Sequence, residues 1–446
     1  MNLPDNLIKI MNLYTDNGFK IYLVGGSLRD IILGKVPKDY DVATDALPED
    51  TKSLMKKNNI KVIETGIKFG TVTIIMEKEQ YEVTTFRIDG DYSNLRHPDE
   101  VIFSNDLVKD LSRRDFTMNA IAYNESEGYI DPFLGKEDIK NNIIRSVRDA
   151  RERFQEDALR MLRAIRFVSQ LDFDIEQDTK DAILALSKNI NYISKERIRE
   201  ELVKCLLGKN VKKCFNIMAE TKILENILPE LSDCVGFDQK NPYHIEDIFD
   251  HTLTVVDLCE YDMEIRFAAL LHDIGKAKTF SIDKNQVGHF YNHEKVSYEL
   301  SKNILDRLKF SNKFKEDVLF LVSNHMTIHE KLNKIKIKKM LNGSSFELLE
   351  KLFKLFRADS ESSFKKQDKL EKIDRCEMLL KEIKDDKEPI CIKDLKINGN
   401  DLIDIGLKYK QIGNALKFLL NNVIMDPSLN NKEDLIKLVK ENLNKF

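Results

Sequence analysis

A glycine-rich turn and a pair of aspartates combine residue types that bind nucleoside triphosphates. Gly25, Gly26 and Ser27 follow an apolar run, and glycine lets backbone N–H groups approach phosphate oxygens because it has no Cβ. Asp39 and Asp41 stand two positions apart on the next extended segment, so their carboxylates point to the same face. Two carboxylates beside a polyphosphate suit divalent metal ions. The combination indicates nucleotidyl transfer.

Three more charged side chains belong to this region. Arg29 lies two positions after Ser27, on the first turn of the next helix, where its guanidinium can hold phosphate oxygens bidentately. Asp30 is interpreted as a local structural partner. Glu82 alternates outward with Thr84 on a later strand. It is either a third carboxylate for the metals or an ordinary charge on a half-exposed strand.

The elements that must position these residues are strands and helices in alternation. Apolar runs predict strands at Lys20–Val24, Thr71–Met76 and Tyr81–Phe86. Helical spacing surrounds them at Leu7–Asp16, Ser27–Leu33 and Pro48–Lys57. After residue 135 the strand signals stop, and apolar positions at helical spacing continue to the end. We therefore expect the α+β class, with a small mixed sheet in the head and an all-helical remainder.

Length and composition limit the alternatives. A chain of 446 residues is too long for one core and predicts two to four domains, and Gly, Pro and Asn breaks indicate at least two subdivisions in the helical remainder. A net charge of −4 argues against a uniformly basic nucleic-acid coat. No apolar run has the length of a membrane span, and the N-terminus has no signal-like segment, so no membrane partner is expected. Six scattered cysteines without a C-x-x-C pair favour a reduced, cytoplasmic setting over zinc or disulfides.

The segment 22–50 resembles the N-terminal signature of class II tRNA nucleotidyltransferases. These are the CCA-adding enzymes and their bacterial poly(A) polymerase relatives, in the DNA polymerase beta superfamily. Five further blocks match the family in order, at residues 82–87, 113–120, 131–135, 156–160 and 194–198. The likeness is close over residues 15–210. It implies a nucleotidyltransferase head at 1–140, a helical neck at 141–235 and a helical body and tail at 361–446.

The resemblance also implies roles for single residues of the head. Asp39 and Asp41 would bind Mg²⁺, activating the primer 3′-hydroxyl and neutralising charge on the phosphates. Gly26 and Arg29 would contact the triphosphate. Arg114 would contact the nucleotide near its ribose. The alternative for the block around Arg114 is a surface cluster of salt bridges.

The neck carries a row of charged residues that could read bases. Asp157 and Arg160 are three positions apart, so on one helix they share a face, and Arg163 and Arg166 continue the row. An aspartate acceptor beside an arginine donor can mimic a Watson–Crick edge for cytosine or adenine. In the family this block selects CTP or ATP without a nucleic-acid template. Arg163 and Arg166 are candidates for contact with the nucleotide. The alternative is that one of the two braces the helix instead.

Two segments distinguish members of the family. Residues 64–72 look like the CCA-adding pattern, whereas the poly(A) polymerases carry a basic, aromatic segment there. The loop 88–98 is full length, and CC-only enzymes usually lack it. The first segment favours a CCA-adding enzyme over a poly(A) polymerase, and the second favours full CCA addition over CC-only addition. A poly(A) polymerase or an A-adding-only enzyme stays as the alternative.

Seven of the eight histidines fall between residues 244 and 329. The segment 270–276 resembles the core of HD-domain metal phosphohydrolases, which implies an HD module at 236–360. The implied ligands are His251, His272, Asp273, His293, His325 and Asp359. Imidazoles with carboxylates suit Mn²⁺, Ni²⁺ or Fe²⁺ at a hydrolytic centre. His289 and His329 either support the metal ligands from outside or have a structural role.

The histidine cluster leaves two uses open. The module hydrolyses a phosphodiester, such as a 2′,3′-cyclic phosphate at a damaged RNA end, or it is a scaffold. A rival from another class is an HD phosphohydrolase whose head only binds RNA.

The last part of the chain predicts contact with RNA. Lys331, Lys334, Lys336, Lys338 and Lys339 form a run without an acid between them. The run is either a solvated helix face or a phosphate-binding surface. Residues 394–430 resemble the family's tail, which grips the acceptor and TΨC arms of tRNA by shape. The expected partners are thus tRNA, CTP and ATP, and the oligomeric state stays open.

Overall fold

The computed structural model describes residues 3–90, 101–240, 246–330, 332–362 and 367–446. The chain forms two compact units. Unit 1 contains Met1–Ser232 and Arg307–Lys309, and unit 2 contains Asp233–Asp306 and Phe310–Phe446. The predicted four-part division stays a prediction. Most of the loop 88–98 lies outside the described residues, as do His244 and Lys331.

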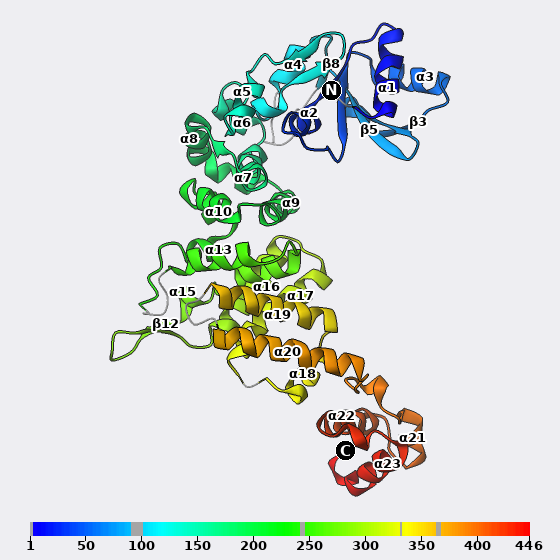
Figure 1. The fold of residues 1–446 in the computed structure, drawn as a ribbon, viewed down its shortest axis with the longest axis vertical. Helices are drawn as coiled ribbons and strands as arrows, with labels where there is room; N and C mark the ends of the chain where they lie inside the picture. Colours follow the sequence, from blue (N-terminus) through cyan, green and yellow to red (C-terminus); the bar gives the residue numbers. More distant parts are fainter. Residues whose placement is uncertain (1–2, 91–100, 241–245, 331, 363–366) are drawn as a thin grey trace. The chain divides into compact units, whose positions relative to one another are not determined.

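A seven-stranded mixed sheet is the framework of unit 1 (blue and cyan in Figure 1). Its order is β3-β4-β5-β2-β1-β8-β9. The strands are β1 (Ile21–Val24), β2 (Tyr40–Thr44), β3 (Lys61–Gly66), β4 (Thr71–Met76), β5 (Glu79–Thr85), β8 (Ala122–Asn124) and β9 (Gly128–Ile130). β2 and β5 pair in parallel, and the other neighbours are antiparallel. This mixed sheet confirms the predicted α+β class.

Helices join and cover the strands. They are α1 (Asp5–Asp16), α2 (Gly25–Ile32), α3 (Pro48–Lys57), α4 (Leu107–Ser112) and α5 (Gly135–Lys140). A 3₁₀ turn, η2 (Thr117–Asn119), and a ribbon of β6 (Arg87–Asp89) and β7 (Val101–Phe103) complete this part. α1 buries Leu7, Ile10, Met11 and Tyr14, which recur at helical spacing. The predicted helices at 7–16, 27–33 and 48–57 are therefore confirmed, apart from small shifts of their ends.

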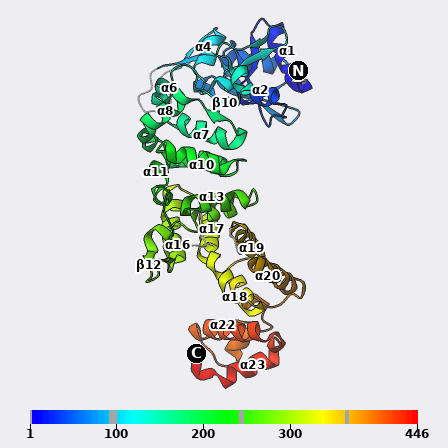
Figure 2. The ribbon, with the colours of Figure 1, turned by 60° about the vertical axis from the view of Figure 1, so that its left-hand side comes forward.

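The rest of unit 1 is helical. Its helices are α6 (Ala150–Glu156), α7 (Leu159–Leu171), α8 (Gln177–Leu186), α9 (Lys195–Leu206), α10 (Val211–Glu220), α11 (Ile223–Ile227) and α12 (Pro229–Ser232). α7 packs against α9 and α10, and α10 lies beside it in Figure 2. Most of its side chains are buried. The charged residues of α7 therefore either line a cavity or pair with buried partners.

The expectation that strands stop after residue 135 is wrong in detail. β10 (Ile143–Ile144) pairs in parallel with β11 (Asp174–Ile175), and β12 (Phe280–Ile282) forms a hairpin with β13 (Gly288–Phe290). Strands of two or three residues are too short to show an alternating pattern, so they could not be predicted from the sequence.

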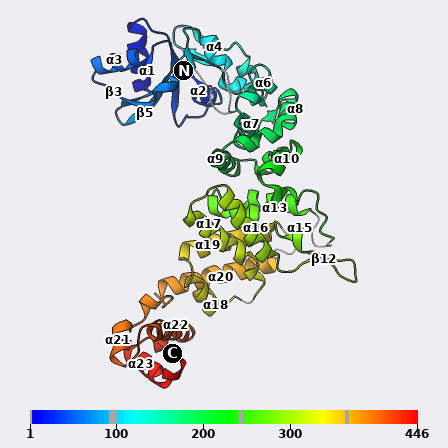
Figure 3. The same cartoon turned by 180° about the vertical axis from the view of Figure 1, so that it is seen from behind.

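Unit 2 is built mainly from helices. They are α13 (Ile248–Leu258), α14 (Met263–Leu271), α15 (Lys276–Thr279), α16 (His293–Arg307), α17 (Asn312–Asn324), α18 (Lys334–Leu341), α19 (Phe346–Glu361) and α20 (Gln367–Asp385). α14 packs against α13, α17 and α19, and Figure 3 shows α17 beside α19. A 3₁₀ turn, η4 (His325–His329), follows α17.

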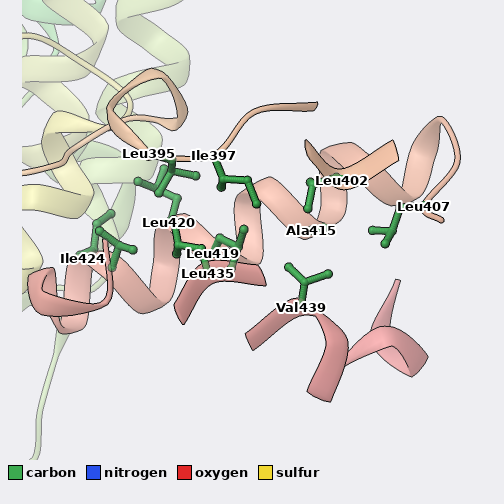
Figure 4. Packing of buried hydrophobic residues seen from close by; sticks show 11 residues of the cluster. Leu395, Ile397, Leu402, Leu407, Ala415, Leu419, Leu420, Ile424, Leu435 and Val439 are labelled. Atoms are coloured by element: carbon green, nitrogen blue, oxygen red, sulfur yellow. The ribbon is translucent and has the colours of Figure 1, made fainter. Parts of the chain in front are cut away.

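The C-terminal helices have an apolar core of their own. They are α21 (Gly399–Asp404), α22 (Lys410–Met425) and α23 (Lys432–Glu441). Leu402, Ala415, Leu419 and Leu435 point into this core, as Figure 4 shows. Across the described parts of the whole chain, no helix is long and apolar enough to cross a membrane.

Candidate functional site

The sheet register brings three carboxylates of unit 1 together. Asp39 immediately precedes β2, Asp41 lies on it, and Glu82 on β5 is the partner of Asp41 in the parallel ladder. Burial is the main cause of a raised pKa at Asp41, to which the charge of Asp39 adds. The pKa of Glu82 is raised by burial and by the two aspartates. Such a cluster favours either protons or metal cations.

The glycine turn lies against these carboxylates. Gly25 has φ +73°, and a Cβ there would be 3.1 Å from Asp41 Oδ2 and 3.2 Å from Arg114. Glycine is therefore required by both the backbone angle and the space. The hydroxyl of the buried Ser27 donates to the Val24 carbonyl at 2.9 Å and accepts the Asp41 N–H at 3.4 Å. Ser27 thus ties α2 to β2.

Arg29 is held in place by two neighbours. Its Nε and Nη2 donate to Asp30 Oδ1 at 3.0 and 2.7 Å, which confirms Asp30 as a local structural partner. Its Nη1 donates to Asn119 Oδ1 at 2.9 Å. The guanidinium also lies 5.0 Å from the ring centre of Phe167. Arg29 is therefore positioned before any ligand arrives.

A cavity of about 590 Å³, the arginine pocket, opens among these elements. It brings together most of the residues that the sequence singled out: Gly25, Gly26, Arg29, Asp41, Arg114, Asp157, Arg160, Arg163 and Arg166. Its lining also includes residues to which the sequence patterns assigned no role: Asn119, Leu159, Phe167, Gln170, Arg197 and Lys204. The many cationic groups concentrate positive potential, which suits a polyphosphate.

One prediction about the arginine-rich segment is wrong. Asp157 and Arg160 do not share a helix face, because Asp157 is an extended residue (φ −136°) at the end of α6. Its Oδ1 accepts the Leu159 N–H at 3.0 Å and so caps the start of α7. Its Oδ2 accepts from Arg197 at 2.9 Å. Both Asp157 and Arg160 nevertheless line the pocket, since the break between the helices opens onto it.

The three arginines of α7 have different partners. Arg160 Nη1 donates to Glu156 at 2.7 Å, and its Nη2 donates to the Arg113 carbonyl at 3.1 Å. Arg163 Nε donates to Asp115 at 2.9 Å. Arg166 is buried and pairs with Glu201 of α9 at 3.0 Å. Arg166 thus braces α7 against α9, as one alternative for this row proposed.

The cluster around Arg114 is a buried network, so its interpretation as surface salt bridges is wrong. The fully buried Asp110 accepts from Arg113 at 2.7 Å and from Arg114 at 3.3 Å. Burial disfavours the charged form of Asp110, yet the two arginines outweigh it and lower its pKa. Sequence reasoning missed Asp110, although its spacing of three and four residues from the arginines was a signal.

A second network joins the two sides of the pocket. Asn119 accepts from Arg29, and its Nδ2 donates to Asp115 Oδ1 at 3.0 Å. Asp115 in turn accepts from Arg163. The chain Arg29–Asn119–Asp115–Arg163 therefore links α2 to α7 through η2. Asn119 carries no charge, and its role was not visible in the sequence.

The predicted histidine ligands of unit 2 converge around Asp273. Its Oδ2 lies 3.6 Å from His251 Nε2 and 3.3 Å from His272 Nε2. Its Oδ1 lies 3.2 Å from His293 Nε2 and 3.7 Å from His325 Nε2. Two ligand sets therefore share Asp273: one with His251 and His272, the other with His293 and His325.

The outward nitrogens of these rings are anchored to the backbone. His272, His293 and His325 place Nδ1 at 2.7, 2.8 and 2.7 Å from the carbonyls of Ala269, Phe290 and Val322. This leaves Nε2 directed inward, the arrangement usual for metal-binding histidines. Burial is the main cause that lowers the pKa of His325 to about 3, so its ring is neutral and able to ligate.

Asp359 completes this centre. Its Oδ1 lies 3.3 Å from His251 Nε2 and 4.0 Å from His272 Nε2. The six groups line a cavity of about 300 Å³, the histidine pocket, whose wall also includes His289 and His329. His272 Nε2 is buried and makes no hydrogen bond within the described part of the chain. These donors fit transition metals of the Mn²⁺, Fe²⁺ and Ni²⁺ kind.

The lysine run is largely ion-paired. Lys334 pairs with Glu388, and Lys336 pairs with Glu330. Lys338 is almost fully buried and lies 2.8 Å from Glu388. Lys339 is exposed. The run is therefore neither a uniform solvated face nor a continuous phosphate-binding surface.

Three family models match the chain. They are described as a poly A polymerase head domain (residues 21–145), a probable RNA and SrmB-binding site of polymerase A (172–234) and an HD domain (248–383). These matches agree with the resemblance of the sequence blocks. The HD match covers all six residues around Asp273.

Curated relatives and a solved structure extend these matches. A CCA-adding enzyme of Leuconostoc mesenteroides is 33% identical over 99% of this chain and 98% of its own length. One of Lactobacillus helveticus is 46% identical over 50% of this chain, and that alignment spans 56% of the relative. The crystal structure of a Bacillus stearothermophilus CCA-adding enzyme in complex with CTP is 28% identical, with a TM-score of 0.74, over 100% of this chain and 99% of the other.

Proposed function

The chain belongs to the CCA-adding enzymes, and from this premise we propose that it adds C, C and A to the 3′ end of tRNA from CTP and ATP without a template. One observation carries the proposal. The arginine pocket joins Asp41 and the glycine turn, which suit a triphosphate and metal, to Asp157 and Arg160, which suit a base. A nucleotidyl transfer site with its own base-reading groups needs no template strand.

Asp39 and Asp41, with Glu82 as a third carboxylate, are the proposed Mg²⁺ ligands. Their oxygens are the donors that Mg²⁺ prefers, and the pKa values of Asp41 and Glu82, which burial and neighbouring carboxylates raise, support a site that a cation would stabilise. When bound, the metal supplies charge neutralisation at the α-phosphate and lowers the pKa of the attacking hydroxyl. Gly26, Arg29 and Arg114 bind the phosphates and ribose, so catalysis rests on positioning and electrostatics.

Asp157 and Arg160 are the proposed base-reading pair. Cytosine and adenine each present an exocyclic amino donor beside a ring-nitrogen acceptor, which match a carboxylate and a guanidinium. Guanine and uracil present a carbonyl where the amino group would be, so the Asp157 carboxylate would repel them. Arg197 and Glu156 hold the two side chains in place. We propose that Arg163 contacts the nucleotide. Arg166 lines the pocket, but its pairing with Glu201 assigns it to holding α7 in place.

The partner is tRNA, which the C-terminal helices would hold by the acceptor and TΨC arms through shape and backbone contacts. We assign the reaction to the cytoplasm because its substrate is tRNA, and six free cysteines agree with a reducing compartment.

Three tRNA transcripts test this function. They end before CCA, after C and after CC, and each is incubated with labelled CTP or ATP. We expect CTP to be incorporated into the first two and ATP into the third. Incorporation of ATP alone would support the A-adding or poly(A) alternative, and no incorporation would contradict the proposal. In D39A/D41A, incorporation should fall by about 10³-fold or more, since metal binding supplies several kcal/mol of transition-state stabilisation.

A second function is favoured by the shared carboxylate of unit 2. We propose that Asp273 would contribute to two metal positions, one that His251, His272 and Asp359 would also hold and another that His293 and His325 would also hold. Mn²⁺, Ni²⁺ and Fe²⁺ are the candidate ions. Bound metal would supply a hydroxide for phosphoester hydrolysis. Lys276, whose Nζ lies 2.7 Å from Asp273 Oδ2, is placed to bind the phosphate.

Metal analysis and hydrolysis assays test this second function. Reconstituted protein should hold two transition-metal ions per chain by mass spectrometry, and H293A/H325A should hold one. The unaltered chain should release phosphate or open the ring of 2′,3′-cyclic nucleotides, and D39A/D41A should retain this activity. Absence of metal at the centre would show that unit 2 is a scaffold.

A further inference from the structure

A second cavity of unit 1 lies against Asp41. It has a volume of about 180 Å³ and is lined by Thr71, Thr84 and Arg87, together with Asp41 and two arginines of the Asp110 network. We call it the threonine pocket. Of these two cavities, Arg29, Gly25 and Gly26 line the arginine pocket, whereas Asp41, Arg113 and Arg114 line both. Asp41 therefore stands between two cavities.

The register of the sheet explains the floor of the threonine pocket. Asp41 pairs with Glu82, and Thr84 lies two residues further along β5, on the same face. Thr71 on β4 is the partner of Thr84 in the antiparallel ladder. The hydroxyls of the two threonines lie 3.1 Å apart and are hydrogen-bonded. One face of three strands thus carries the metal carboxylates and, next to them, a pair of hydroxyl groups.

A buried carboxylate positions the cationic residues that line the threonine pocket. The fully buried Asp110 accepts the backbone N–H of Arg87 at 3.3 Å and the side chain of Arg113 at 2.7 and 2.9 Å. The Arg87 guanidinium is held further by the Phe69 carbonyl and lies 5.8 Å from the Phe69 ring centre. Two guanidinium groups are therefore fixed beside the two hydroxyl groups. Such a set suits a sugar joined to a phosphodiester.

The chemistry of nucleotidyl transfer requires two sites around the metal carboxylates. In an in-line displacement the attacking hydroxyl enters opposite the leaving pyrophosphate. The 3′ oxygen forms a bond to the α-phosphorus, the bond from that phosphorus to the pyrophosphate oxygen breaks, and the hydroxyl proton passes to water. Because the glycine turn and Arg29 hold the triphosphate on one side of Asp41, the hydroxyl must come from the other side.

Resting on the proposed function, we propose that the threonine pocket binds the 3′-terminal nucleotide of the acceptor RNA. Thr71 and Thr84 contact its ribose, and Arg87 and Arg113 bind its 5′ phosphate. Its 3′-hydroxyl then faces Asp41 and the α-phosphate of the nucleotide in the arginine pocket. The two pockets divide the work: one selects the incoming nucleotide, and the other holds the strand that grows.

A cross-linking experiment tests where the RNA end lies without requiring catalysis. A tRNA ending in CC, with a photoreactive analogue as its last nucleotide, is irradiated with the full chain and digested for mass spectrometry. We expect cross-linked peptides from residues 71–87. Cross-links confined to α2 and α7 would overturn the proposal. If the unaltered chain adds no nucleotide but still cross-links at 71–87, the proposed function fails and the RNA-end site stands.

Kinetics of Arg87 variants separate this site from the nucleotide site. In R87Q we expect the KM for tRNA ending in CC to rise about tenfold, while the dissociation constant for CTP, measured by calorimetry, changes less than twofold. R87K should recover part of the loss because it keeps the charge. R148Q, which alters an exposed arginine that pairs with Glu152 of α6, serves as the control. Weaker CTP binding with an unchanged KM for tRNA would overturn the proposal.

T84V provides a variant of nearly constant volume. It removes one of the paired hydroxyls, so we expect a lower kcat/KM on tRNA ending in ribose and a smaller effect when the terminal sugar is 2′-deoxyribose. An equal loss on both acceptors would contradict contact between Thr84 and the ribose. The thermal midpoint, with and without CTP, shows whether the variant remains folded.

Discussion

At the scale of single residues, the carboxylates of unit 1 illustrate how a site is prepared for metal. Asp41 is partly buried beside Asp39 and Glu82, and its pKa rises because partial burial outweighs the attraction of Arg114. The raised pKa means that burial and neighbouring negative charge disfavour the ionised carboxylates. A cation bound beside them would relieve this unfavourable interaction.

The raised pKa values predict a pH-dependent metal affinity. Asp41 and Glu82 keep their protons at a higher pH than ordinary carboxyl groups, so protons compete with Mg²⁺ as the pH falls and the effect disappears as it rises. We expect the Mg²⁺ concentration for half-maximal CTP incorporation to increase on acidification, starting above the usual carboxyl range. Mg²⁺ titrations across that range measure it. E82Q should flatten the dependence, and an unchanged slope would contradict a role for Glu82.

Asn119 is predicted to couple the phosphate side to the base side of the arginine pocket. N119A leaves Arg29 and Asp115 each without one buried hydrogen bond, at a cost of about 1–3 kcal/mol. We expect the KM for both CTP and ATP to rise roughly 5- to 100-fold, as that energy implies. Steady-state kinetics measure it. N191A, which removes an exposed amide bonded to Asn226, should leave both values unchanged.

At the scale of elements, close contacts between short segments fix the position of the site. η2 carries Asn119 and lies against the start of α5, where Gly135 leaves room for the Thr117 carbonyl. The buried Thr117 hydroxyl also donates to Asp138 of α5 at 2.6 Å. The network around Asp115 therefore depends on the packing of one 3₁₀ turn on one helix.

Gly135 provides a test of this dependence. In G135A the methyl group would overlap the Thr117 carbonyl, so η2 must move. We expect a loss of about 1–3 kcal/mol in the free energy of unfolding, together with weaker CTP binding. Urea unfolding and calorimetry measure the two effects. G413A is the control, because its methyl group enters open space on α22 and should stabilise by up to about 1 kcal/mol.

At the scale of the whole molecule, each unit has its own candidate ligand site. The arginine pocket lies wholly in unit 1, and the histidine pocket lies wholly in unit 2. A ligand that binds the folded state stabilises the region it contacts, by about 2.7 kcal/mol at 100 times its dissociation constant. The two units should therefore respond to different ligands.

Hydrogen exchange with mass spectrometry measures this response. We expect Mn²⁺ or Ni²⁺ to slow exchange around residues 251–273, 293 and 325, and CTP with Mg²⁺ to slow it around α2 and α7. H293A/H325A should reduce the first effect and leave the second. Protection of both regions by either ligand alone would contradict independent sites.

The sequence by itself determined those features that short-range patterns encode. Side-chain periodicity predicted α1, α3 and β4, because alternation and helical spacing follow from backbone geometry alone. The spacing of Gly25–Gly26 and of Asp39 and Asp41 predicted a phosphate-binding turn beside a carboxylate pair, because residues close in the chain lie close in space. The family resemblance then supplied a set of histidines, and the structure brings these together around Asp273.

The tertiary structure decided what depends on distant segments. Parallel pairing of β2 with β5 places Glu82 beside Asp41, and Thr84 and Thr71 beyond it. A side-chain cap at Asp157 breaks a segment that resembled one helix. Asn119 acquires its role only from partners that packing brings to it, and Asp273 divides one histidine set into two. Strand register and burial arise from contacts between distant segments, so no local pattern in the chain predicts them.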